Sequence, residues 1–95
     1  MKFMVTFIPK EEKKEAILEI MQEEIAHVNA LRAAGVVHEV FAEEPGKAWM
    51  TMEAASMNEA EGLVYGLPVF PFIISNISPL AVYIVDGRTE TTPIN

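Results

Sequence analysis

The sequence predicts an α+β fold in which strands and helices follow one another in the order βαββαβ. Three observations lead to this prediction. Short runs of apolar, aromatic and β-branched residues alternate with two longer stretches of helical periodicity. Glycines and prolines punctuate the boundaries between them. The chain of 95 residues is also long enough for only one small core, so residues 1–95 are expected to form a single domain, with 81–95 as a C-terminal arm.

The first strand is expected at Phe3–Ile8, which is rich in aromatic and β-branched residues and ends at Pro9. A charged stretch, residues 10–15, then leads into a long helix that continues to Ala34. Gly35 is suited to the position just after that helix, where a left-handed backbone is common. The helix is predicted from apolar residues that recur at helical spacing, namely Ile17, Met21, Val28 and Leu31.

Val36–Ala42 and Lys47–Ala55 are expected to be the second and third strands, joined as a hairpin by a turn at 43–46 that contains Pro and Gly. Ser56 followed three residues later by Glu59 forms a capping box, which predicts the start of a second helix that runs to about Gly66. The fourth strand is expected at Phe70–Ser78.

This order is that of a ferredoxin-like fold, with an antiparallel sheet covered by two helices on one face. Both faces of the predicted strands are apolar, because Phe3 and Val5 alternate with Met4, and Met50 lies next to Trp49. Two helices cover one face only, so the other face needs a partner sheet. The sequence therefore predicts a homo-oligomer built as a dimeric α+β barrel.

Composition limits the classes of partner. The net charge of −7 argues against nucleic acid, which is bound by clustered basic residues. The chain has no cysteine, which excludes disulfides and thiolate metal sites. The apolar run before Pro9 is too short for a signal sequence or a membrane span, so we expect a cytoplasmic protein without a membrane partner.

Glu24 and His27 are the leading candidates for chemistry. They lie one turn apart on a helical stripe that is otherwise apolar. Partial burial would raise the pKa of the carboxyl group and a neighbouring imidazole would moderate that shift, which suits transfer of a proton at carbon. The alternative is that Glu23 or Glu24 pairs with His27 at the rim of a solvated face. His38, on the second strand, is a further catalytic candidate, and its alternative role is that of a core histidine.

Four further residues are candidates for binding a substrate: Trp49, Tyr65, Phe72 and Asn76. Aromatic side chains at these positions could instead be part of the core, and a polar residue on the last strand could be an exposed edge position. No phosphate-binding loop, dinucleotide motif or nucleophile elbow is present in the sequence. With two histidines and no cysteine, the sequence does not favour a metal site either. We therefore expect no cofactor and no metal, and a small molecule as substrate or ligand.

The segment Leu67-Pro68-Val69-Phe70-Pro71-Phe72, followed by Ser78-Pro79-Leu80-Ala81, resembles the LPLFPY-type segment of the muconolactone Δ-isomerase family. The resemblance implies a dimeric ferredoxin-like unit and a cofactor-free enzyme that moves a double bond in an unsaturated lactone by proton abstraction and return. When the helix-ending Gly35 is aligned, Glu23 and Glu24 fall in the acidic cluster of the family, and Glu24 meets a family glutamate.

The sequence departs from the family at two places. Ile25 stands where the family has a lysine, and His38-Glu39-Val40-Phe41 replaces a segment that contains an arginine able to hold a carboxylate. We therefore expect an isomerase-like enzyme whose native substrate differs from muconolactone, with Glu24 inside a closed pocket between the first helix and the sheet. The alternative is a non-catalytic oligomeric ligand-binding or assembly module on the same scaffold, with Glu24 in water.

Overall fold

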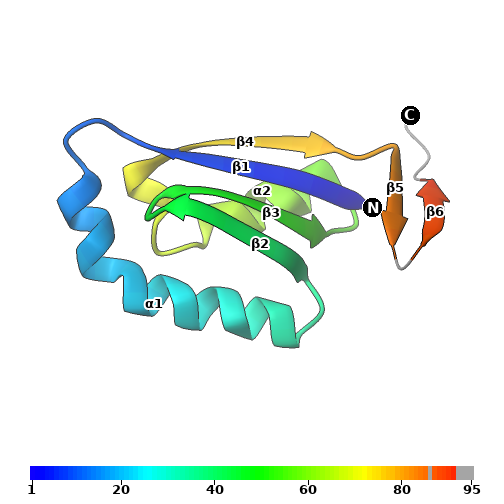
Figure 1. Cartoon of the computed structure of the whole chain (residues 1–95), viewed down its shortest axis with the longest axis horizontal. Helices are drawn as coiled ribbons and strands as arrows, with labels where there is room; N and C mark the ends of the chain where they lie inside the picture. Colours follow the sequence, from blue (N-terminus) through cyan, green and yellow to red (C-terminus); the bar gives the residue numbers. More distant parts are fainter. Residues whose placement is uncertain (86, 92–95) are drawn as a thin grey trace.

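A computed structural model describes residues 1–85 and 87–91 of the chain, and the rest of the predicted arm lies outside these residues. The elements are β1 (Lys2–Pro9), α1 (Lys14–Ala33), β2 (Val37–Glu44), β3 (Lys47–Glu53), α2 (Met57–Tyr65), a 3-10 turn η1 (Phe70–Phe72), β4 (Ile73–Pro79), β5 (Val82–Val85) and β6 (Arg88–Thr91). The predicted order βαββαβ is confirmed, and the short hairpin of β5 and β6 follows it (Figure 1).

One four-stranded antiparallel sheet in the order β2-β3-β1-β4 carries the fold. Phe3, Val5 and Phe7 of β1 point to the helix side of this sheet and are almost completely buried. Apolar side chains of both helices join them in one core cluster, to which α1 contributes Ile17 and α2 contributes Val64. Because both helices reach the same core, they cover one face of the sheet and leave the other open.

The helix ends follow from local chemistry. Gly35 has φ of 78° and donates its N–H to the carbonyl oxygen of Arg32, while the Val36 N–H donates to Leu31, so α1 ends in the glycine motif that the sequence predicts. At the start of α2, the Ser56 hydroxyl accepts a hydrogen bond of 3.1 Å from the Glu59 N–H. This contact satisfies one of the amides that a helix leaves unpaired at its first turn.

Two strands differ from their predicted form. The fourth strand begins at Ile73 and not at Phe70, because residues 70–72 form a 3-10 turn in which the Phe72 N–H donates to the Val69 carbonyl. In β2, the pairing with β3 shifts between Val37 and Val40, which is the mark of a β-bulge. The bulge interrupts the two-residue alternation of side chains, which by itself predicts His38 on the same face as Val36 and Val40.

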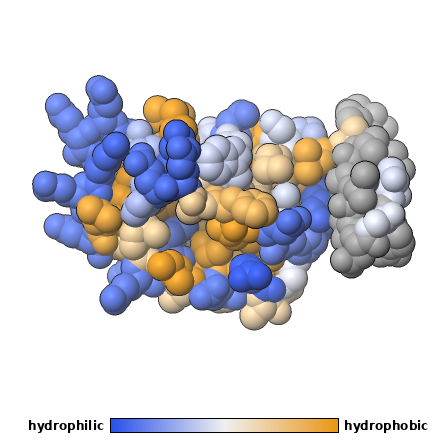
Figure 2. Space-filling model, in the orientation of Figure 1, coloured by the Kyte–Doolittle hydropathy of each residue, from blue (hydrophilic) through white to orange (hydrophobic). Residues whose placement is uncertain are grey.

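The face of the sheet away from the helices carries exposed apolar side chains, Ile8, Phe41, Trp49 and Ile74. Figure 2 shows one face of the molecule, with apolar side chains in its middle and hydrophilic ones gathered at the end where β1 passes into α1. The residues described here include no helix of the length and hydropathy needed to cross a membrane.

Candidate functional site

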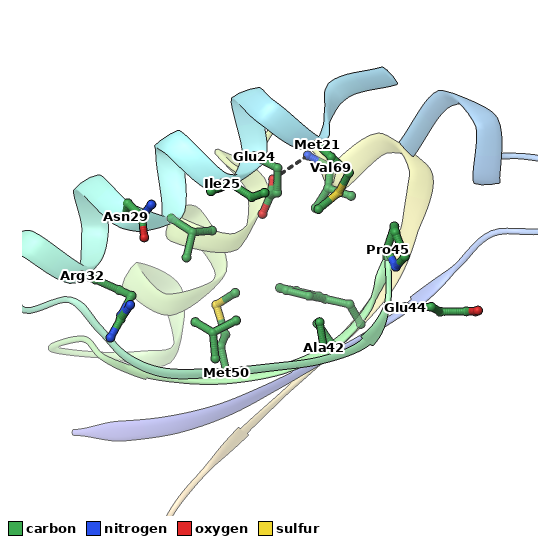
Figure 3. Close-up of a pocket in the computed structure, with 15 residues that line it drawn as sticks. Met21, Glu24, Ile25, Asn29, Arg32, Ala42, Glu44, Pro45, Met50 and Val69 are labelled. Atoms are coloured by element: carbon green, nitrogen blue, oxygen red, sulfur yellow. Dashed lines mark hydrogen bonds between the residues drawn. The ribbon is translucent and has the colours of Figure 1, made fainter. Parts of the chain in front are cut away.

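A cavity of about 280 Å³ lies between α1 and the sheet and is partly open to solvent (Figure 3). One wall is α1, which contributes Met21, Glu24, Ile25, Val28, Asn29 and Arg32. The opposite wall is the sheet, which contributes Phe7, Val40, Ala42, Ala48 and Met50. Its volume is just below the range that is typical of ligand pockets, about 300–1,000 Å³, so the cavity suits only a small molecule.

The turn between β2 and β3 closes one end of this cavity with Glu44, Pro45 and Gly46. Gly46 has φ of 85°, and a Cβ atom built on it would lie 2.7 Å from Cδ1 of Ile17. A glycine is therefore required here twice, for the left-handed backbone and for the close approach of the turn to α1. Lys14 of α1 and Glu44 form an ion pair of 3.5 Å across the same junction.

Glu24 is the carboxylic acid in the interior of the cavity. Its side chain points from α1 into the space above the sheet, and the residue is only 7% exposed (Figure 3). Oε1 accepts a hydrogen bond of 3.0 Å from the backbone N–H of Val69, in the segment that follows α2. Among the described residues, every buried side-chain oxygen or nitrogen atom has a hydrogen-bond partner. Oε2 of Glu24 has no such partner, so this oxygen is not buried. Oε2 is therefore accessible to solvent, and it belongs to a residue that lines the cavity.

Burial raises the pKa of Glu24 above its ordinary value, because the apolar surroundings disfavour the charged form. Two weaker effects oppose this shift. The Val69 N–H stabilises the carboxylate by its hydrogen bond, and the positive form of His27 stabilises it through space. The result is a carboxyl group that is fixed at one oxygen and whose proton affinity is increased by desolvation.

The other two catalytic candidates do not line the cavity. His27 is half-buried one turn along α1 and acts on Glu24 through its charge. His38 sits at the bulge of β2, where Nε2 lies 3.0 Å from the carbonyl oxygen of Gly35 at the end of α1. The structure thus brings His27 close to Glu24 and holds His38 at the C-terminal end of α1.

The four candidates for substrate binding lie outside the cavity wall. Trp49 and Asn76 both pair with Thr6 of β1 and belong to the open face of the sheet. Tyr65 is exposed, and its hydroxyl donates to Oε2 of Glu61 while its ring contacts Phe70. Phe72 packs against the core cluster from the 3-10 turn. None of these four side chains meets Glu24 within one chain.

Three groups at the cavity were not identified from the sequence. Asn29 and Arg32 are polar residues on the cavity side of α1, and the Val69 N–H comes from a segment 45 residues away from Glu24. Arg32 lies eight positions after Glu24, about 80° from it around the helix, so the spacing was a usable signal for Arg32. Asn29 is about 140° from Glu24 and had no such signal. The contact with Val69 had no local signal, because it depends on where the chain returns after α2.

The sequence matches the family model of muconolactone delta-isomerase over residues 1–86. A search of curated proteins gave no significant match. Within the described residues, no group of three or more histidine, aspartate or glutamate side chains is arranged to hold a metal ion. Residues 1–86 include all six elements of the βαββαβ unit and β5, so the family match covers them.

Two solved structures have a similar fold. A crystal structure of muconolactone isomerase superimposes with a TM-score of 0.72 and 14% identity, covering 97% of this chain and 100% of that one. The 5-chloro-2-hydroxyhydroquinone dehydrochlorinase of Burkholderia phenoliruptrix, in complex with 2,5-dihydroxybenzoquinone, also gives a TM-score of 0.72, with 13% identity over 84% of this chain and 93% of that one. The scaffold is thus shared with enzymes that convert small molecules. Because the family model matches nearly the whole chain, residues 1–86, this chain belongs to the muconolactone delta-isomerase family.

Proposed function

We propose that this protein is an isomerase-like enzyme that shifts a double bond in a small unsaturated lactone or related carbonyl compound, without a cofactor, and that Glu24 carries the proton. We also propose that its native substrate differs from muconolactone. The departures of Ile25 and Phe41 from the family pattern support this second part of the proposal.

One observation supports the proposal more than any other. Glu24 presents a desolvated carboxyl group, held at Oε1 by the Val69 N–H, to a mostly apolar cavity of about 280 Å³. A general base at carbon needs a raised proton affinity, and burial supplies it. It also needs a fixed direction of attack, and the backbone hydrogen bond restricts how the carboxyl group rotates.

The proposed reaction is a proton abstraction followed by a proton return. Oε2 of ionised Glu24 takes a proton from a carbon next to the conjugated carbonyl system, and the C–H electron pair enters that system as an enolate. The double bond shifts, and Glu24, now neutral, returns the proton to another carbon of the same system. No atom is gained or lost, and the second step restores the carboxylate for the next cycle.

Replacing the base tests this proposal. Glu24→Gln keeps the size of the side chain and its ability to accept from Val69, but it cannot carry the proton. We expect the variant to lose about 10²-fold or more of the rate at which the enzyme isomerises, or exchanges deuterium from D₂O into, an unsaturated lactone. Nuclear magnetic resonance measures both reactions on a panel of such lactones.

Glu23→Gln is the matched control, because Glu23 is adjacent, exposed and loses the same charge. It should retain full activity, and both variants should stay within about 1 kcal/mol of the parent in unfolding free energy. Undiminished turnover by Glu24→Gln would remove Glu24 from the mechanism. Binding of lactones without exchange in the parent protein would favour the ligand-binding module over the enzyme.

A further inference from the structure

Arg32 is the basic side chain among the described residues that line the cavity. It extends from α1 toward the sheet, at the end of the cavity opposite Glu44 and Pro45 (Figure 3). Within the described part of the chain it makes no ion pair and no side-chain hydrogen bond. Its guanidinium group therefore leaves five N–H donors unused by these residues.

The charge of the surroundings makes this cation significant. The chain has a net charge of −7, and the other ionisable side chains at the cavity are the acids Glu24 and Glu44. Glu44, at the opposite end of the cavity, forms an ion pair with Lys14. An anionic group on a ligand is therefore attracted more strongly at Arg32 than elsewhere in the cavity.

The spacing along α1 fits one ligand that contacts both Glu24 and Arg32. The two residues are eight positions apart, which corresponds to a rise of about 12 Å along a helix. Both side chains lie on the cavity side of α1, so a ligand in the cavity can lie between them. The wall between them is apolar, formed by Val28 of α1 and Met50 of β3.

We propose that Arg32 is a specificity-determining residue that binds an anionic oxygen group of the substrate, a carboxylate or an ionised enol, and so sets which carbon lies beneath Glu24. The inference rests on the proposed function in that it takes this cavity as the substrate site. The proposal places a guanidinium group on α1, whereas the second strand of this chain has Phe41 where the family has an arginine.

A structural role for Arg32 has to be separated from this one. Arg32 lies in the last turn of α1, where a positive charge also stabilises a helix. A binding measurement separates the two roles. If Arg32 only stabilises the helix, its replacement will not change how strongly the protein prefers charged over neutral ligands. Such a measurement does not depend on turnover either, so it is independent of whether Glu24 is the base.

The experiment compares ligands of equal shape and different charge. Benzoate and benzamide probe a carboxylate, while 4-nitrophenolate and 4-nitroanisole probe an ionised enol-like oxygen. Isothermal titration calorimetry gives Kd, and amide chemical shifts locate the site. We expect the parent protein to bind at least one anion about tenfold more tightly than its neutral partner. The pair that shows the preference identifies the source of the anionic oxygen.

Variants assign the preference to one side chain. Arg32→Met should abolish it, whereas Lys13→Met, an equal change of charge at an exposed position of the chain away from the cavity, should leave it unchanged. Glu24→Gln should retain or strengthen it, because a negative charge leaves the cavity. Equal binding of anions and neutral partners, retention of the preference in Arg32→Met, or no saturable binding of either anion at millimolar concentration would each overturn the proposal.

Discussion

At the scale of single residues, Glu24 shows how one buried acid acquires unusual chemistry. Its neighbour Glu23 has the same side chain but lies in solvent, whereas Glu24 is 7% exposed and accepts a hydrogen bond from Val69. Desolvation raises the pKa of Glu24 more than that hydrogen bond and the charge of His27 lower it. The balance favours the neutral acid more than in an unfolded chain.

This balance predicts a pH dependence of stability. A carboxyl group whose pKa is raised in the folded state contributes stability below its unfolded-state pKa, and this contribution is lost as the pH rises through the folded-state pKa. The parent protein should therefore lose stability relative to Glu24→Gln as the pH rises from acid to neutral. Chemical denaturation of both proteins across this range measures the difference, and a difference of the opposite sign would contradict the burial of Glu24.

At the scale of elements, the cavity exists because a turn, a helix and a sheet meet at short distances. The β2–β3 turn closes one end of the cavity, and Gly46 allows that turn to approach Ile17 of α1. The segment after α2 closes the cavity from another direction, with Val69 against Glu24. The pocket is thus a consequence of how these two connections and the sheet pack against α1.

The close approach at Gly46 can be tested with two alanine substitutions. Both Gly46→Ala and Gly35→Ala put a side chain on a backbone with positive φ, 85° and 78° respectively, which costs about 1–3 kcal/mol. Only the Cβ atom at Gly46 also meets neighbouring side chains, since that at Gly35 has nothing within 4 Å. We expect Gly46→Ala to be the more destabilising by about 1 kcal/mol or more in denaturant titrations. Equal losses would show that the turn has room for a side chain.

At the scale of the whole molecule, the sheet is covered on one face only. Phe41 is 62% exposed on the open face, with Trp49 beside it in register. Exposed aromatic and aliphatic side chains on neighbouring strands are typical of an interface. A second copy of the chain offers a sheet of the same character, which is the reason for expecting the dimeric α+β barrel.

A charge on this face should therefore dissociate the assembly. We expect the parent to have at least the mass of a dimer in light scattering and Phe41→Glu to shift it toward a monomer. Leu18→Glu is the matched control, because Leu18 is 61% exposed on the outer side of α1 and the change in charge is equal. A parent of monomer mass, or a stronger effect of Leu18→Glu, would contradict the expected interface.

The sequence by itself determined the order of elements, the glycine end of α1, the Ser56 cap and the apolar character of both sheet faces, because these features depend on neighbouring residues and on regular periods. It also placed Glu24 on the apolar stripe of α1. Only the tertiary structure decided which groups meet at the cavity. Val69 contacts Glu24 from 45 residues away, and the bulge in β2 moves His38 to the end of α1. Such contacts depend on how distant segments pack together, and local patterns in a sequence do not specify them.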